Sequence, residues 1–241
     1  MDNQTFLNVL KQSFLTYLQT HARSNEKLKV LHGQIAQDID NKIKDKNTDK
    51  ENYTVSSLGF GDGKEEKIQG RYFDKKVDIS IKKNNEVKVS IGIKYVMSNY
   101  NQNINNYFEN MLGETANIRC YPISSNRKYF QLMIIPDKLP YFYKDDEKSP
   151  EWEEMTDEHI KRYEILSQYD AEQFFHTPDK TLLYIVHIEE PGREIKDRQD
   201  YNNYYLNNNF SIQLSNKQFN FDCGVIFNDY ERFIEEVVSS I

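Results

Sequence analysis

Cysteine, tryptophan and long apolar runs are scarce in this sequence. Its 241 residues include 2 cysteines and 1 tryptophan. Because Cys120 and Cys223 lie far apart, they predict neither a zinc site nor a disulfide framework, and we expect both to be small buried residues. No apolar run approaches the roughly 18 residues of a membrane-spanning helix, and no charged leader precedes an apolar segment. We therefore expect a cytoplasmic protein that does not contact a membrane.

The sequence also lacks an excess of positive charge and several familiar enzyme motifs. Its net charge of -7 argues against a nonspecific basic coat for nucleic acid, yet allows a DNA enzyme whose positive surface is confined to one cleft. The glycine-rich segment 59–63 lacks the Lys-Ser/Thr ending of a phosphate-binding loop, so we interpret it as a turn. We interpret His187, within a buried strand, as a core residue. The five histidines show no metal-ligand spacing: His21, His32, His159, His176 and His187.

Helical and strand periodicities predict one domain of the α/β (α+β) class. The expected architecture is a central mixed sheet with an antiparallel meander over residues 68–95 and helices on both faces. Expected helices cover 6–18, 26–44, 101–117, 156–173 and 229–240. Expected strands cover 53–60, 68–73, 77–81, 87–95, 129–135, 182–188 and 210–214. The polar stretches 44–52 and 145–152 are expected to be a surface loop and an insertion.

An acidic residue and a lysine occur on adjacent predicted strands. In 77–81 the odd positions are apolar, so Asp78 points away from the core face. In 87–93 the odd positions are Val or Ile, which places Lys94 on the same kind of face. A three-residue loop at 83–85 would bring the two side chains together, whereas a two-residue turn at Asn84-Asn85 would separate them.

The predicted helix 101–117 carries polar residues that suit a nucleic-acid site. Glu109 and Glu114 offer carboxylates, and Glu114 lies nearer the apolar stripe of the helix. Carboxylates beside a strand aspartate and a lysine are the parts of a Mg²⁺-dependent phosphodiesterase site. Amides along one edge of the helix can contact DNA phosphates or base edges. These amides belong to Asn103, Asn106, Asn110 and Asn117.

This arrangement resembles the core of the PD-(D/E)XK nuclease superfamily, best known from type II restriction endonucleases. The resemblance covers roughly residues 68–135 and implies a restriction-endonuclease-like core at 53–135. Residues 1–50 would add N-terminal helices, and 136–241 C-terminal helices and strands. It also implies Mg²⁺-dependent hydrolysis of double-stranded DNA by a homodimer, in which Asp78 holds the metal and Lys94 acts on the attacking water.

The sequence departs from the family pattern at Gly92, where the second metal-binding carboxylate would stand. One explanation is that the carboxylate has moved to the helix, where the resemblance favours Glu109 over Glu114. Glu109→Ala would then be inactive, and adding Gly92→Glu to it would be expected to restore some cleavage, because a glutamate at position 92 could reach a metal held by Asp78. The other explanation is a catalytically silenced DNA-binding protein on the same fold. A protein-interaction module with a tyrosine-rich surface is a third reading.

Overall fold

Two apolar strands form the centre of the sheet, β6 (Lys128–Pro136) and β9 (Lys180–Ile188). They pair in parallel, and nearly all of their side chains are buried. Continuous apolar runs of this kind are typical of strands covered on both faces. The computed structural model describes residues 1–20, 24–46, 52–121, 127–143 and 148–241.

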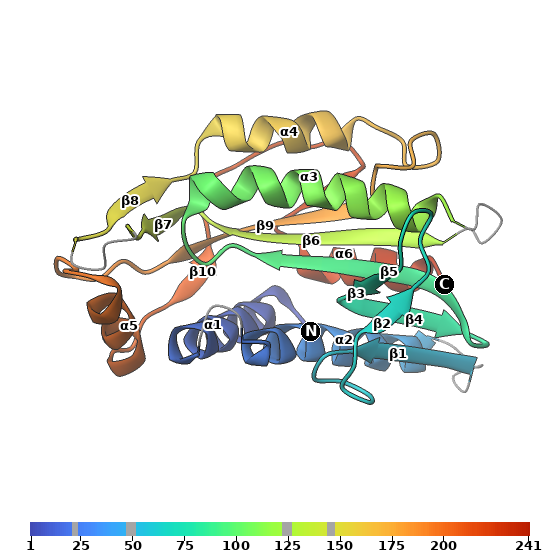
Figure 1. Cartoon of the computed structure of the whole chain (residues 1–241), viewed down its shortest axis with the longest axis horizontal. Helices are drawn as coiled ribbons and strands as arrows, with labels where there is room; N and C mark the ends of the chain where they lie inside the picture. The colour runs from blue at the N-terminus through green and yellow to red at the C-terminus, as the bar shows by residue number, and fades with distance from the viewer. Residues whose placement is uncertain (21–23, 47–51, 122–126, 144–147) are drawn as a thin grey trace.

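The chain forms a mixed α/β structure in which a curled mixed sheet lies between helices (Figure 1). The strand order of this seven-stranded sheet is β1-β4-β5-β6-β9-β10, and β11 pairs with β9. The remaining strands of the sheet are β1 (Tyr53–Ser57), β4 (Ile79–Lys83), β5 (Glu86–Tyr95), β10 (Ile212–Leu214) and β11 (Val225–Phe227). Strands β1, β4 and β5 are antiparallel neighbours, whereas β5 and β6 are parallel.

Helices cover both faces of the sheet (Figure 1). α3 (Tyr100–Arg119) and α4 (Asp157–Ser167) lie on one face, and α1 (Asn3–Gln19), α2 (Glu26–Lys46) and α6 (Tyr230–Ser239) lie on the other. α5 (Arg198–Asn207) contacts α1. Because β5 and β6 are parallel, the chain must cross one face between them, and α3 is that crossover. This places α3 over the side of β5 that carries Lys94.

Two small hairpins stand apart from the main sheet. β2 (Glu66–Ile68) pairs with β3 (Lys75–Val77), and β7 (Lys138–Tyr141) pairs with β8 (Glu151–Glu154). The prediction of a strand over 68–73 is therefore wrong, because that segment forms the end of the β2–β3 hairpin. The predicted helix 156–173 ends at Ser167.

Parts of the predicted polar loop and insertion, residues 47–51 and 145–147, lie outside the described residues, as does His21. Both cysteines are more accessible than predicted: Cys120 is half-buried and Cys223 is exposed. In the described part of the chain, no helix has the length and apolar character that a membrane crossing requires.

Candidate functional site

A two-residue turn joins β4 to β5, in place of the three-residue loop that would bring Asp78 and Lys94 together. Asn84 and Asn85 form it with φ angles of 52° and 66°, as in the type I′ turns that favour asparagine. A ladder continued without interruption from this turn would leave Asp78 and Lys94 on opposite faces.

A β-bulge reverses that outcome. The register shifts by one residue between Lys82 and Ile81. On the side of this shift away from the turn, Ser80 lies opposite Ser90. Because a one-residue shift exchanges the two faces of a strand, Asp78 and Lys94 come to share a face. Their shared face therefore depends on the bulge rather than on the turn.

Asp78 lies where the pairing of β4 with β5 stops. The last pair of this ladder is Ile79 with Ile91. Further along β5, the Oδ2 atom of Asp78 accepts a hydrogen bond from the backbone N–H of Ile93 at 2.6 Å. Hydrogen bonds to an ionised carboxylate are among the stronger ones in proteins. This bond fixes the carboxylate beside the open edge of β5.

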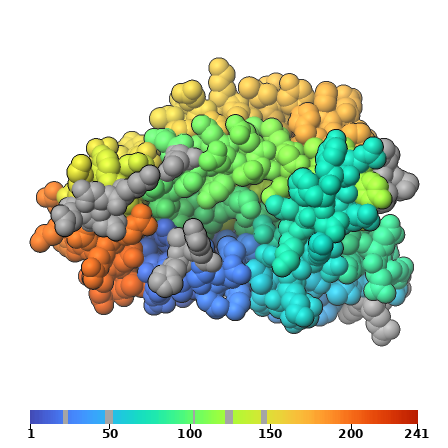
Figure 2. All heavy atoms as spheres, viewed as in Figure 1, coloured from blue at the N-terminus to red at the C-terminus, as the bar shows by residue number. Residues whose placement is uncertain are grey.

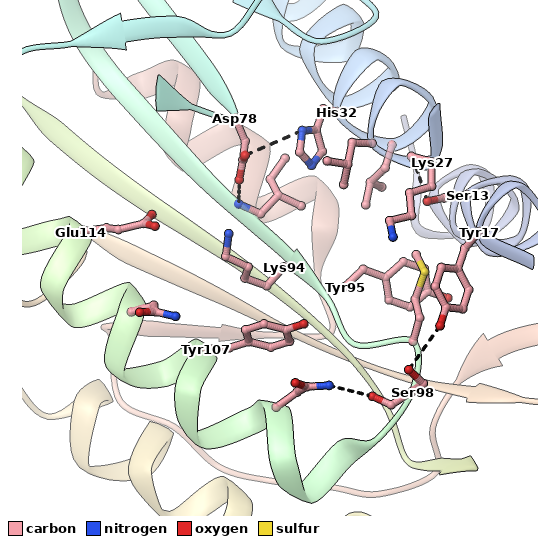
Figure 3. A pocket seen from close by; sticks show the side chains of 16 residues that line it. Ser13, Tyr17, Lys27, His32, Asp78, Lys94, Tyr95, Ser98, Tyr107 and Glu114 are labelled. Atoms are coloured by element: carbon pink, nitrogen blue, oxygen red, sulfur yellow. Dashed lines mark hydrogen bonds and ion pairs between the residues drawn. The ribbon is translucent and has the colours of Figure 1, made fainter. Parts of the chain in front are cut away.

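A cavity of about 460 Å³ adjoins this edge, between α1 and α2 on one side and α3 on the other (Figure 3). Asp78 and Lys94 line it together with His32 from α2 and Glu114 from α3. Lys94 is half-buried and forms no hydrogen bond or ion pair with any residue that the structure describes. Its ammonium group is therefore available to a ligand in the cavity.

Three side chains from separate segments place metal-binding atoms close together: His32, Glu65 from the loop before β2, and Asp78. One ligand atom from each lies within 4.8 Å of the other two. His32 is 1% exposed, and neither of its ring nitrogens forms a hydrogen bond within the described residues. Its Nδ1 lies 3.9 Å from Oδ1 of Asp78. A buried polar atom without a partner is costly, and these three residues could hold a metal ion that His32 would contact.

Burial sets the protonation of the cluster. It lowers the pKa of His32 below the ordinary value of 6.5, an effect that Asp78 opposes and Lys94 reinforces. Burial also raises the pKa of Glu65 above 4.5, and the charge of Asp78 raises it further. His32 is therefore a neutral imidazole at pH 7, which is the form that binds metals. A cation between the carboxylates would relieve their repulsion.

Two glycines bring α2 close enough for His32 to reach the cluster. A Cβ atom on Gly33 would lie 2.8 Å from the carbonyl oxygen of Gly59, and one on Gly59 would lie 2.3 Å from the carbonyl oxygen of Lys29. Gly59 also has a φ of 78°, which favours glycine. The segment 59–63 is thus a turn packed on α2, and it leads directly to Glu65.

A glutamate at position 92 would force buried side chains on β6 to move, an obstacle that the sequence did not predict. Gly92 lies opposite Gln131 in the parallel ladder of β5 and β6. A Cβ atom there would lie 2.3 Å from the hydroxyl oxygen of Tyr129 and 2.6 Å from Oε1 of Gln131. Both side chains are buried, and close-packed interiors do not absorb such overlaps without strain.

The two helix carboxylates are placed differently. Glu114 lines the cavity, forms an ion pair with Lys75 at 2.5 Å and accepts a hydrogen bond from the Tyr129 hydroxyl at 3.3 Å. Glu109 is exposed and is not among the residues that line the cavity. The preference for Glu109 as the metal ligand thus finds no support in its position, and Glu114 is the helix carboxylate near Asp78.

The four asparagines expected to contact DNA do not form one surface. Asn103 and Asn110 line the cavity, and Asn103 donates a hydrogen bond to the carbonyl oxygen of Ser98 at 3.1 Å. Asn106 is exposed. Asn117 is buried, and its amide bonds to the backbone of residues 72 and 73. A structural role for Asn117 replaces the predicted contact with DNA.

The histidine predictions also change. His32 interrupts the apolar stripe of α2 that Leu31, Ile35 and Ile39 define, and this interruption was the one signal for its role in the sequence. Glu65 lies in a mixed charged run and carries no such signal. His187 is half-buried and pairs with Asp137 at 3.1 Å, so it is less enclosed than predicted.

Comparison of the chain with protein-family models, curated proteins and solved structures finds no match.

The lowered pKa of His32 predicts a pH dependence of stability in the metal-free protein. Between the folded-state pKa and 6.5 the unfolded chain binds more protons at this residue, so its contribution to the free energy of unfolding decreases as the pH falls. We expect the wild type to lose free energy of unfolding relative to His32→Gln as the pH falls below about 6.5. Urea denaturation of both proteins with a chelator measures this difference. A difference that does not change with pH would contradict this assignment.

Proposed function

We propose that this protein is a metal-dependent, site-specific endonuclease for double-stranded DNA, a type II restriction enzyme with a PD-(D/E)XK core. The proposal depends on one observation: Asp78 and Lys94 line the same cavity. Asp78 also belongs to the cluster with His32 and Glu65. Perturbed titratable groups in a cleft are typical of functional sites.

The order of elements supports the same proposal. The antiparallel strands β1, β4 and β5 lead through the crossover α3 into the parallel strand β6. Asp78 directly precedes β4 and Lys94 lies near the end of β5, as in the core that the sequence resembles. By the usual symmetry of site-specific DNA enzymes, a homodimer would read a palindromic sequence.

The residues present fit a divalent cation. Glu65 and Asp78 supply the carboxylate oxygens that suit Mg²⁺ and Mn²⁺, and the imidazole of His32 adds a nitrogen donor. In this proposal His32 and Glu65 take over the task of the missing carboxylate at Gly92. A cation held by these residues would polarise the phosphate and lower the pKa of a coordinated water.

The chain's own side chains complete the mechanism. The backbone N–H of Ile93 holds Asp78 in place, so that this carboxylate is pre-organised before substrate arrives. Lys94 orients the attacking water and offsets the negative charge that develops on the phosphoryl group. The Tyr129 hydroxyl and Lys75 hold Glu114 at the cavity wall, where its carboxylate can accept a hydrogen bond from that water.

Mixed-sequence plasmid or phage DNA, incubated with the purified protein and Mg²⁺, Mn²⁺ or EDTA, tests the proposal. Discrete fragments that require metal support a site-specific endonuclease. DNA that is bound and stays intact under both metals supports the silenced DNA-binding protein. If the protein neither binds nor cuts DNA, the result supports the protein-interaction module.

Replacing Asp78 by asparagine is expected to weaken metal binding with little effect on folding. The amide oxygen can still accept the hydrogen bond from Ile93, while the charge is lost. Since even indirect partners of a metal change affinity by roughly 10–100-fold, we expect at least that loss for Mn²⁺ measured by calorimetry. Glu109→Gln is the matched control and should bind as the wild type does. A large fall in melting temperature with unchanged affinity would show instead that Asp78 is structural.

A further inference from the structure

Two aromatic side chains stand exposed at the end of the β2–β3 hairpin. Tyr72 is 81% exposed and Phe73 is 58% exposed, more than any other large hydrophobic residue that the structure describes. The hairpin, residues 66–77, projects across the front of α3 in the space-filling view (Figure 2). Exposed aromatics of this extent usually mark a surface that binds something.

Hydrogen bonds hold the end of this hairpin in a defined shape. The Asn117 side chain accepts from the backbone N–H of Tyr72 at 2.9 Å and of Phe73 at 3.4 Å, and it donates to the carbonyl oxygen of Phe73 at 2.9 Å. The Arg127 guanidinium donates to the carbonyl oxygen of Gln69 at 2.7 Å. The aromatic rings are therefore presented on a fixed backbone, which lowers the entropy lost on binding.

The charge of the hairpin suits a polyanion. Residues 66–77 contain four basic and two acidic side chains, within a chain of net charge -7. Two of the basic side chains, Arg71 and Lys76, are exposed and form no ion pair with any described residue. A positive element on an acidic protein attracts phosphate groups and keeps the contact local.

The hairpin also leads directly into the cavity. β3 ends at Val77, the residue before Asp78, and Lys75 pairs with Glu114 on the cavity wall. At about 3.3 Å per residue, Phe73 lies at most about 17 Å from Asp78, a length that a nucleic-acid strand covers in about five nucleotides. A strand held at the cavity can therefore reach the aromatic pair.

We infer that the β2–β3 hairpin binds the nucleic acid beside the scissile phosphate. Tyr72 and Phe73 stack on bases that are unpaired or opened at this point, and Arg71 and Lys76 contact the neighbouring phosphates. Aromatic side chains bind bases by stacking irrespective of sequence, and wedges of this kind open base steps in duplex DNA. The inference rests on the proposed function, because it names how the same site engages its substrate.

Fluorescence anisotropy with labelled oligonucleotides in EDTA tests the inference without cleavage. The probes are a single strand, a duplex and a duplex with an unpaired central segment. For the double variant Tyr72→Ala/Phe73→Ala we expect affinity for the two unpaired probes to fall on the order of tenfold or more. Phe175→Ala, which removes an exposed aromatic outside the hairpin, is the matched control and should bind as the wild type does. A 2-aminopurine base in the unpaired segment should be quenched by the wild type and released from quenching in the double variant.

The outcomes separate this inference from the proposed function. If the wild type binds and cuts DNA and the double variant does so with equal affinity, the hairpin inference fails and the endonuclease stands. If the wild type binds none of the three probes, both fail. A change in sedimentation of the double variant, with DNA affinity unchanged, would mean that the aromatic pair contacts another protein chain, which also overturns the inference.

Discussion

Replacing Lys94 by alanine is expected to lower metal-dependent DNA cleavage by about 10²–10³-fold while DNA affinity stays nearly unchanged. The lysine lines the cavity with Asp78 and forms no hydrogen bond or ion pair with the rest of the described chain. Its charge is therefore free to act on the transition state, where negative charge on the phosphoryl group is greatest. Single-turnover cleavage and anisotropy, measured on the same DNA, separate the two effects.

The matched control is Lys88→Ala on the same strand. Lys88 pairs with Glu86 at 2.7 Å at the far end of β5, outside the cavity lining, so its loss should leave cleavage within a few-fold of the wild type. The melting temperature of Lys94→Ala should also remain near that of the wild type, because no hydrogen bond or ion pair with the described residues is lost. Cleavage by Lys94→Ala at nearly the wild-type rate would remove this lysine from the mechanism.

Adding a single methyl group at Gly92 is expected to destabilise the protein by about 1–3 kcal/mol. That is a large part of the roughly 5–15 kcal/mol that stabilises a typical domain. The new Cβ would meet the Tyr129 hydroxyl at 2.3 Å and Oε1 of Gln131 at 2.6 Å. Urea denaturation of Gly92→Ala measures the effect. Gly92→Glu should lose more stability and should not gain cleavage, because its longer side chain enlarges the overlap.

Two further variants make the steric explanation specific. Gly113→Ala adds the same methyl group on α3, where no atom beyond its chain neighbours and the backbone of the helix itself lies within 4 Å. Because alanine is the better helix former, it should stabilise by roughly 0.5–1 kcal/mol. Tyr129→Phe removes the nearest clashing oxygen, so Gly92→Ala should cost less in that background. If Gly92→Ala were as stable as the wild type, the packing of β5 against β6 would differ from that described.

The apolar strands and amphipathic helices were predictable because each follows a local period. The run at 129–135 appears as β6 and the stripe at 6–18 as α1, since burial of one face or of both faces leaves its pattern within a few adjacent residues. The prediction of a strand over 68–73 was wrong because it too used only a local pattern. Its aromatic residues favour a strand locally, but bonds from the distant Asn117 hold it in a turn.

The sequence by itself determined the mixed α/β class and the alternation of apolar residues around Asp78 and Lys94. Tertiary structure decided the rest of the candidate site. The bulge between β4 and β5 set the register of the two strands. The close approach of Gly33 to Gly59 brought His32 near Glu65. Side chains on β6 occupy the space that a side chain at position 92 would need. Such contacts join segments that are remote in the chain, and they depend on how whole elements pack. The periodicity of the sequence does not depend on that packing. The buried His32 and the Glu65 of a charged run could therefore be recognised as one cluster only from the tertiary structure.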